Sequence, residues 1–144
     1  IDAEVKTPYT YYGGMKAHRS LVHEGPFDEA LYTSKDEILE GTTFSFFIVK
    51  NGSVITSKLD GRILGSVTRK NLLRIMDAQN IQHSESIISI EDLKSSSEAF
   101  IASANRDLIP VVSVSGNKIG DGKIGPVYEK LMSLYQQELL KINI

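Results

Sequence analysis

The chain has 144 residues, the length of one domain with a sizeable single core. Hydrophobic residues make up 41% and charged residues 24%, as in an ordinary soluble globular protein. The net charge of −2 gives no reason to expect nucleic acid as a partner, and the absence of cysteine excludes disulfides, thiolate nucleophiles and cysteine metal sites.

The first predicted elements are short. Residues 14–24 mix polar and apolar side chains, which we interpret as the end of a helix that Gly25-Pro26 stops. Residues 27–33 predict a strand, and the polar residues 34–37 predict a turn.

A hairpin and a helix follow. Asn51-Gly52 stands between apolar runs at residues 44–50 and 53–56. Because both positions of a type I′ turn need positive φ, Asn-Gly in this place is a strong hairpin signal. Residues 68–79 predict a helix with an apolar stripe formed by Leu72, Leu73, Ile75 and Met76.

The second half alternates strands and helices. Residues 81–90 are strand-like, residues 91–95 predict a short helix, and residues 99–103 and 111–115 predict two strands. A glycine-rich loop at residues 120–125 then leads into the last helix.

Pro126 suits the first turn of that last helix, because its missing N–H has no partner there in any case. The pattern has no strict βαβ alternation, internal repeat or linker. We therefore predict a single mixed α/β domain over residues 1–144.

Four separated segments resemble, in order, the C-terminal domain of the class IV aminotransferases, which depend on pyridoxal phosphate. They are Val5-Lys6-Thr7 with Tyr11; residues 28–31 leading to residues 39–43; residues 63–69; and residues 109–111 leading to residues 119–122 and 125–126. The resemblance runs from about Val5 to Tyr135. It implies the fold-type IV architecture, a mixed sheet or pseudo-barrel with flanking helices.

The resemblance assigns the two central roles to Lys6 and Glu40. Lys6 matches the lysine that forms a Schiff base with the cofactor's aldehyde and, once freed, moves the α-proton of the substrate. Glu40 matches the carboxylate that keeps the pyridine nitrogen protonated. The separation of 40 − 6 = 34 residues fits the family's interval. Taken alone, Lys6 would be a solvated lysine and Glu40 an exposed turn residue.

Six further positions match residues that contact the cofactor. Tyr11 matches a tyrosine at the phenolic oxygen in the branched-chain branch, although Tyr9 and Tyr12 make an ordinary aromatic cluster an alternative. Val67 and Thr68 match the residues that hold the phosphate; a helix start favours an anion, and Thr68 could equally be a plain N-cap.

Leu64 matches a residue on a face of the cofactor ring, or is part of the core. Ser103-Ala104-Asn105 matches a loop that adds a phosphate contact. The sequence departs from the family at Ala104, where many relatives carry threonine, at Ser45, commonly asparagine, and at Ser66, often glycine. These differences argue against a close match to a named subfamily.

Other sites are not predicted. His18, His23 and His83 have no metal-ligand spacing, so we expect no metal. No apolar run approaches the roughly 18 residues of a membrane span, and no signal-peptide pattern opens the chain. Together with the lack of cysteine, this leads us to expect a cytoplasmic protein without membrane partners.

Family members have a smaller N-terminal domain before the lysine, and only five residues precede Lys6 here. We therefore expect a fragment that lacks this domain and is by itself a weak or inactive catalyst. The resemblance implies transfer of an amino group between an amino acid and a 2-oxo acid, by a homodimer. The alternatives are a lyase of the aminodeoxychorismate type and a non-catalytic domain of the same fold.

Overall fold

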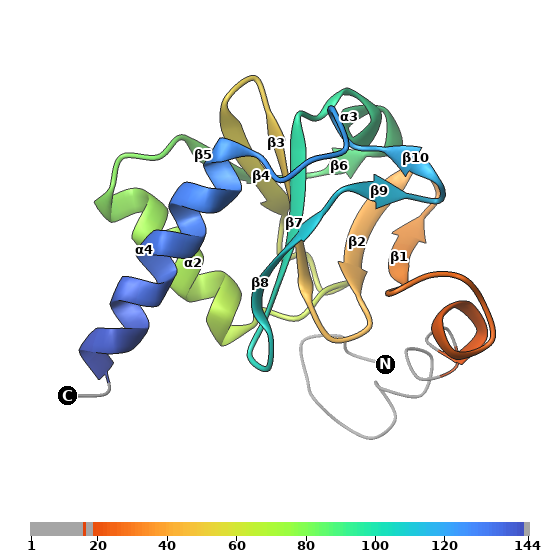
Figure 1. The fold of residues 1–144 in the computed structure, drawn as a ribbon, viewed down its shortest axis with the longest axis horizontal. Helices are drawn as coiled ribbons and strands as arrows, with labels where there is room; N and C mark the ends of the chain where they lie inside the picture. The colour runs from red at the N-terminus through yellow and green to blue at the C-terminus, as the bar shows by residue number, and fades with distance from the viewer. Residues whose placement is uncertain (1–15, 17–18, 143–144) are drawn as a thin grey trace.

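A five-stranded sheet forms the centre of the computed structural model, which describes Lys16 and residues 19–142 (Figure 1). Its order is β5-β4-β3-β7-β8, and only the pair β4–β5 is parallel. The strands are β3 (Ser45–Lys50), β4 (Ser53–Ser57), β5 (His83–Ser86), β7 (Glu98–Ser103) and β8 (Asp107–Val111). The predicted mixed sheet is thereby confirmed.

The two central strands are buried on both faces. Every residue of β7, and all of β3 except Lys50, is buried, which explains why these strands are almost continuously apolar. Phe47 and Phe100 stand opposite each other across β3 and β7, with their rings stacked at 4.9 Å. Both faces of the sheet therefore need a covering layer.

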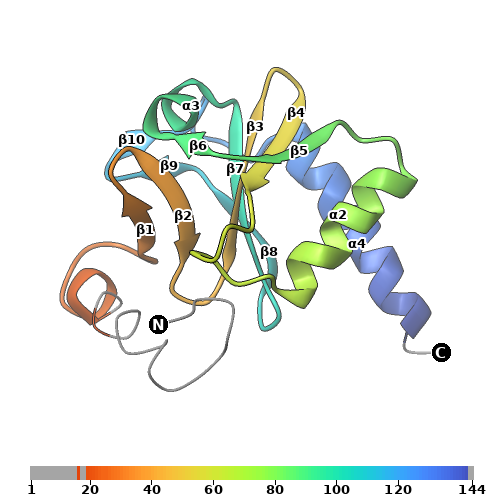
Figure 2. The same ribbon diagram turned by 180° about the vertical axis from the view of Figure 1, so that it is seen from behind.

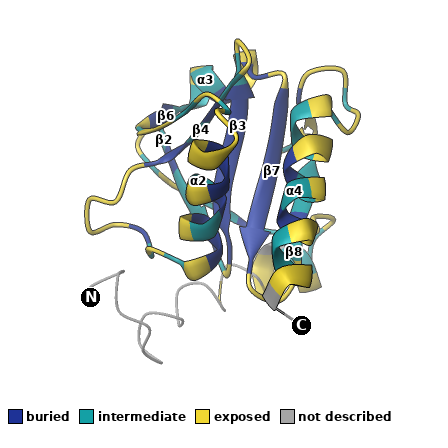
Figure 3. Cartoon of the chain, turned by 90° about the vertical axis from the view of Figure 1, so that its left-hand side faces the viewer, coloured by how far each residue is buried: buried dark blue, intermediate teal, exposed yellow. Residues whose placement is uncertain are grey.

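Helices α2 (Val67–Ala78) and α4 (Pro126–Ile142) cover one face of this sheet, as Figure 3 shows. Their apolar stripes pack on the sheet residues in a first core. Its fully buried members include Leu72, Met76 and Leu131 from the helices and Phe47 and Phe100 from the strands. The 3.6-residue spacing of apolar residues in α2 and α4 is thus explained by one face of each helix packing on the sheet.

The opposite face is covered by a smaller, antiparallel sheet of order β1-β2-β6 and by the helix α3 (Figure 2). These elements are β1 (Leu31–Ser34), β2 (Glu37–Gly41), β6 (Ile88–Ser89) and α3 (Ile90–Ser95). Ile38, Ile48 and Ile88 meet there in a second core. A two-stranded ribbon, β9 (Ser113–Val114) and β10 (Asn117–Lys118), and the π-helical turn η1 (Arg19–His23) complete the described chain.

Several predicted elements are confirmed. The hairpin β3–β4 turns at Asn51 and Gly52, whose φ values are +51° and +76°. Helix α2 spans residues 67–78 where residues 68–79 were predicted, α3 spans 90–95, and α4 begins at Pro126.

Other predicted boundaries were wrong. The strand predicted over residues 27–33 is shorter and lies at Leu31–Ser34. The turn predicted over residues 34–37 is also shorter, because Glu37 is already the first residue of β2. The single strand predicted over residues 81–90 is two strands, β5 and β6, in different sheets. Residues 111–115, predicted as one strand, contain the last residue of β8 and the short strand β9 (Ser113–Val114), which belong to different sheets. Most of β8 lies earlier than predicted, where Pro110 is tolerated because β8 is an edge strand.

Candidate active site

Glu40 projects from β2 and is held by the loop that precedes α2. Both of its carboxylate oxygens accept the backbone N–H of Leu64, each at 3.2 Å. Among the described residues this N–H is the one donor within hydrogen-bond distance of the carboxylate. The carboxylate is therefore fixed in place but retains capacity to accept another hydrogen bond.

Burial raises the pKa of Glu40 from 4.5 to about 7. The N–H of Leu64 and the positive charge of Arg69 act in the opposite direction but do not cancel the effect of burial. Near neutral pH both charge states of Glu40 are thus populated. A carboxyl group that exchanges a proton near pH 7 can share one with a basic ring nitrogen.

Tyr32 is a neighbour of Glu40 that the sequence analysis did not identify. Burial raises the pKa of Tyr32, and the negative charge of Glu40 raises it further, so the two groups lie within electrostatic reach. Tyr32 belongs to β1, whose partner is β2, with Leu31 opposite Gly41. Finding it required the β1–β2 pairing, which the predicted turn at residues 34–37 obscured.

Helix α2 begins at Val67, three residues after Leu64, whose N–H binds Glu40. Ser66 is its N-cap, and the Ser66 Oγ accepts the N–H of Arg69 at 3.1 Å. The alternative that Thr68 is the N-cap is therefore wrong. Val67 and Thr68 occupy the first turn, where backbone N–H groups lack partners within the helix and favour an anion.

The side chains of Val67 and Thr68 point in different directions. Val67 is 74% exposed, whereas Thr68 is only 4% exposed. Leu64 is half-buried, so both of its interpretations, ring contact and core residue, stay open.

The start of α2 is also tied to the central sheet. The hydroxyl groups of Ser45, in β3, and Ser66 lie 3.1 Å apart. Two of the three positions at which the sequence departs from the family pattern are therefore in contact.

Ser103 and Ala104 lie at the same end of the sheet. Ser45 pairs with Ala102, the residue before Ser103, in the β3–β7 register. Ser103 is buried and its Oγ accepts the N–H of Arg106 at 3.2 Å, which shapes the turn, while Ala104 is exposed. The β7–β8 turn is thus joined to the α2 start through Ser45.

The structure therefore brings Glu40, Leu64, Val67 and Thr68 together, with the Ser103-Ala104 turn at the same sheet end. Lys6 and Tyr11 lie outside the described residues, so their predicted roles stay predictions.

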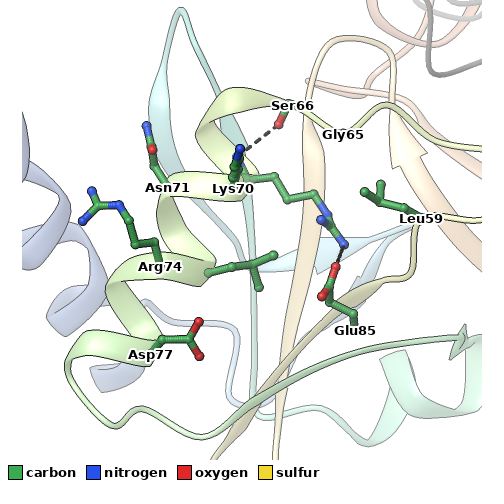
Figure 4. A pocket seen from close by; sticks show the side chains of 10 residues that line it. Leu59, Gly65, Ser66, Lys70, Asn71, Arg74, Asp77 and Glu85 are labelled. Carbon is green, nitrogen blue, oxygen red and sulfur yellow. Dashed lines mark hydrogen bonds and ion pairs between the residues drawn. The ribbon is translucent and has the colours of Figure 1, made fainter.

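A pocket of about 610 Å³ lies along α2 (Figure 4). Leu59, Gly65, Ser66, Lys70, Asn71, Arg74, Asp77 and Glu85 are labelled on its wall, with Arg69 and Leu73 completing it. Glu40, Leu64, Val67 and Thr68 do not line this pocket. It is a surface groove along α2 and not the predicted cofactor site.

Residues 19–142 and Lys16 contain no cluster of three metal-ligating side chains. Within the same part of the chain, no helix has the length and apolarity needed to cross a membrane.

Comparison with known proteins gives matches along most of the chain. Residues 2–114 match the family described as amino-transferase class IV. A D-alanine aminotransferase of Staphylococcus haemolyticus is 31% identical over 103 residues, covering 72% of this chain and 36% of the relative. A probable branched-chain-amino-acid aminotransferase of Aquifex aeolicus is 32% identical over 137 residues, which cover 94% of this chain and 44% of the relative.

Solved structures of aminotransferases resemble the fold of this chain. The branched-chain aminotransferase of the archaeon Thermoproteus uzoniensis, crystallised with norvaline, superposes with a TM-score of 0.87 at 25% identity, covering 95% of this chain and 45% of that one. The chain therefore spans less than half the length of the relatives it matches.

Proposed function

Because the chain belongs to the class IV aminotransferase family, we propose that it is the cofactor-binding part of an enzyme that transfers an amino group between an amino acid and a 2-oxo acid. Family members use pyridoxal phosphate. When bound, this cofactor withdraws electrons from the α-carbon of the amino acid. The observation that carries the proposal is the Glu40 carboxylate, fixed by the Leu64 N–H next to the start of α2.

The described residues fit the two ends of the cofactor. The Glu40 carboxylate accepts one backbone N–H and can accept a second hydrogen bond, which suits a protonated ring nitrogen. With a pKa of about 7, Glu40 can also share the proton of that nitrogen. The backbone N–H groups at the start of α2, at Val67 and Thr68, suit a phosphate. Leu64 joins the two places because its N–H binds Glu40 and it lies three residues before Val67.

The remaining roles follow the family resemblance. Lys6 bonds covalently to the cofactor and moves the α-proton, Tyr11 donates to the phenolic oxygen, and the Ser103-Ala104 turn adds a phosphate contact. In this chain Ala104 has no hydroxyl, so Ser103 or backbone N–H groups make that contact.

Reductive labelling tests the proposal directly. Pyridoxal phosphate is added to the purified chain, borohydride fixes the adduct, and peptide mass mapping identifies the labelled lysine. We expect a near-visible absorption band before borohydride is added and the label on Lys6 afterwards, both lost in Lys6→Ala. Lys16→Ala is the matched control and retains both. Label spread evenly over the chain's lysines would contradict the proposal.

Substrate and assembly are part of the proposal. The relatives' names divide between D-alanine and branched-chain amino acids. Assays that supply D-alanine or L-leucine with 2-oxoglutarate separate these two substrate classes, and pyruvate release from aminodeoxychorismate would indicate a lyase instead. The resemblance favours a homodimer, which analytical ultracentrifugation tests.

A further inference from the structure

Arg69 is a buried cation at the start of α2, next to Thr68. Its side chain is only 3% exposed. Its Nη2 donates to the carbonyl oxygen of Ser57 at 2.9 Å and to the carboxylate of Glu85 at 2.6 Å, and Figure 4 marks the latter ion pair by a dashed line at Glu85. Its Nε is buried and has no hydrogen-bond partner among the described residues.

A buried guanidinium with one unpaired N–H is costly for folding. Its partner Glu85 is 46% exposed, so water screens this pair and limits its contribution to stability. An apolar side chain at this position would avoid the cost of desolvating the charge. The charge of Arg69 is therefore better explained by an effect on a neighbouring group than by the ion pair alone.

A chain of hydrogen bonds leads from Arg69 to the strand that carries Glu40. Arg69 donates to the Ser57 carbonyl, and the Ser57 Oγ donates at 2.8 Å to the carbonyl of Ile38, two residues before Glu40 in β2. Ser57 is 5% exposed and Ile38 is 3% exposed, so the path is buried. It joins α2 and the central sheet to the smaller sheet.

Three ionisable groups of the described residues bear on the charge of Glu40 or lie on its strand. Tyr32 on β1 adds no charge near pH 7, because a phenol is ordinarily neutral there and burial raises the pKa of Tyr32 further. Glu37, earlier on the same strand, forms an ion pair with Arg62 at 2.7 Å. Within the described part of the chain, Arg69 is the one charged side chain among the causes that shift the pKa of Glu40, and it lowers that pKa.

We propose that Arg69 is a positioning residue that sets the charge of Glu40 and holds β2 against the start of α2, and that Glu85 weakens its effect on Glu40. This deepens the proposed function, on which it rests for the meaning of Glu40 as the partner of the ring nitrogen. The relation between the three charges exists without cofactor, so it is tested separately.

Carbon-13 NMR of the chain labelled at the glutamate carboxyl groups measures the titration midpoint of Glu40, with Glu40→Gln for assignment. Arg69→Met removes the cation, and we expect the midpoint to rise by about one pH unit. Arg69→Lys retains the charge and restores most of the wild-type midpoint. Glu85→Gln removes the competing anion, and we expect a smaller shift to lower pH.

Opposite shifts in Arg69→Met and Glu85→Gln are the signature of a charge effect, because destabilisation alone gives no such sign change. Arg74→Met, on the exposed face of the same helix, is the control and leaves the midpoint unchanged. If Arg69→Met does not fold, Glu85→Gln decides. A midpoint that is unchanged or raised in Glu85→Gln overturns the inference.

The cofactor experiment is independent of this one. If the midpoints shift as expected but Lys6 is not labelled by pyridoxal phosphate, the proposed function fails and the charge relation stands. If Lys6 is labelled but the midpoints do not respond to Arg69 and Glu85, the present inference fails alone.

Discussion

The environment of Glu40 differs from that of an ordinary carboxylate at the surface, because burial raises its pKa. Leu64 and Arg69 both favour its charged form, yet burial prevails and the pKa rises to about 7. The folded chain therefore binds a proton that the unfolded chain releases at lower pH. That difference links the charge of Glu40 to the stability of the fold.

The link predicts a pH dependence of stability. Because the folded pKa lies above the unfolded value of 4.5, the contribution of Glu40 is fully present below pH 4.5 and is lost as the pH rises to about 7. Allowing for partial solvent exposure, we expect the loss to be about 1–2 kcal/mol. Urea unfolding from pH 4.5 to pH 8 measures it.

Glu40→Gln should flatten this part of the profile, since the amide oxygen can still accept the Leu64 N–H. Glu91→Gln, at an 82% exposed carboxylate on α3, is the control and should leave the profile as it is. The same decline in Glu40→Gln as in the wild type would show that other groups cause it.

At the scale of elements, the glycine-rich loop has a clear structural purpose. Glu98, at the start of β7, is only 7% exposed, and its two oxygens accept the N–H groups of Val127 and Tyr128 at 3.1 Å and 2.9 Å. A side chain of strand β7 thus caps the N-terminus of helix α4. A Cβ at Gly125 would lie 2.1 Å from the Glu98 side chain, so the approach requires glycine.

Loss of this cap should destabilise the chain. Glu98→Ala leaves two N–H groups of α4 without their acceptor, and we expect a loss of about 1–3 kcal/mol in the free energy of unfolding. Glu98→Gln retains one acceptor oxygen and should lose less. Glu129→Ala, in the exposed first turn of α4, is the control. Urea denaturation that ranks Glu98→Ala with Glu129→Ala would refute the capping role.

The elements with strong local signals could be predicted from the sequence. Asn51-Gly52 fixes the hairpin by its turn geometry, and the apolar spacing of α2 and α4 fixes the helices. The strand β2, which carries Glu40, could not be predicted, because its five residues form a strand through pairing with β1 and β6. The sequence therefore singles out Glu40 by family resemblance, whereas its bond to Leu64 and the proximity of Arg69 depend on tertiary structure.

At the scale of the whole molecule, one sheet serves two cores. Residues of β3 alternate between them: Phe47 and Val49 face α2 and α4, whereas Phe46 and Ile48 face the smaller sheet. The candidate site lies where the two layers meet, because Glu40 belongs to the smaller sheet and the start of α2 to the other layer. Its geometry therefore depends on both cores being packed.

This arrangement predicts that damage to either core unfolds the whole chain. Leu72 lies in the first core and Ile88 in the second, and both are 0% exposed. We expect Leu72→Ala and Ile88→Ala each to reduce the free energy of unfolding by about 2–5 kcal/mol. Since β3 and β7 line both cores, each variant should unfold in one transition, with coincident circular dichroism and tyrosine fluorescence curves. Leu140→Ala, at a 68% exposed position of α4, should change stability little. Two separate transitions in Ile88→Ala would mean that the smaller sheet melts alone, in which case Glu40 would lose its place beside α2 while the first core stays folded.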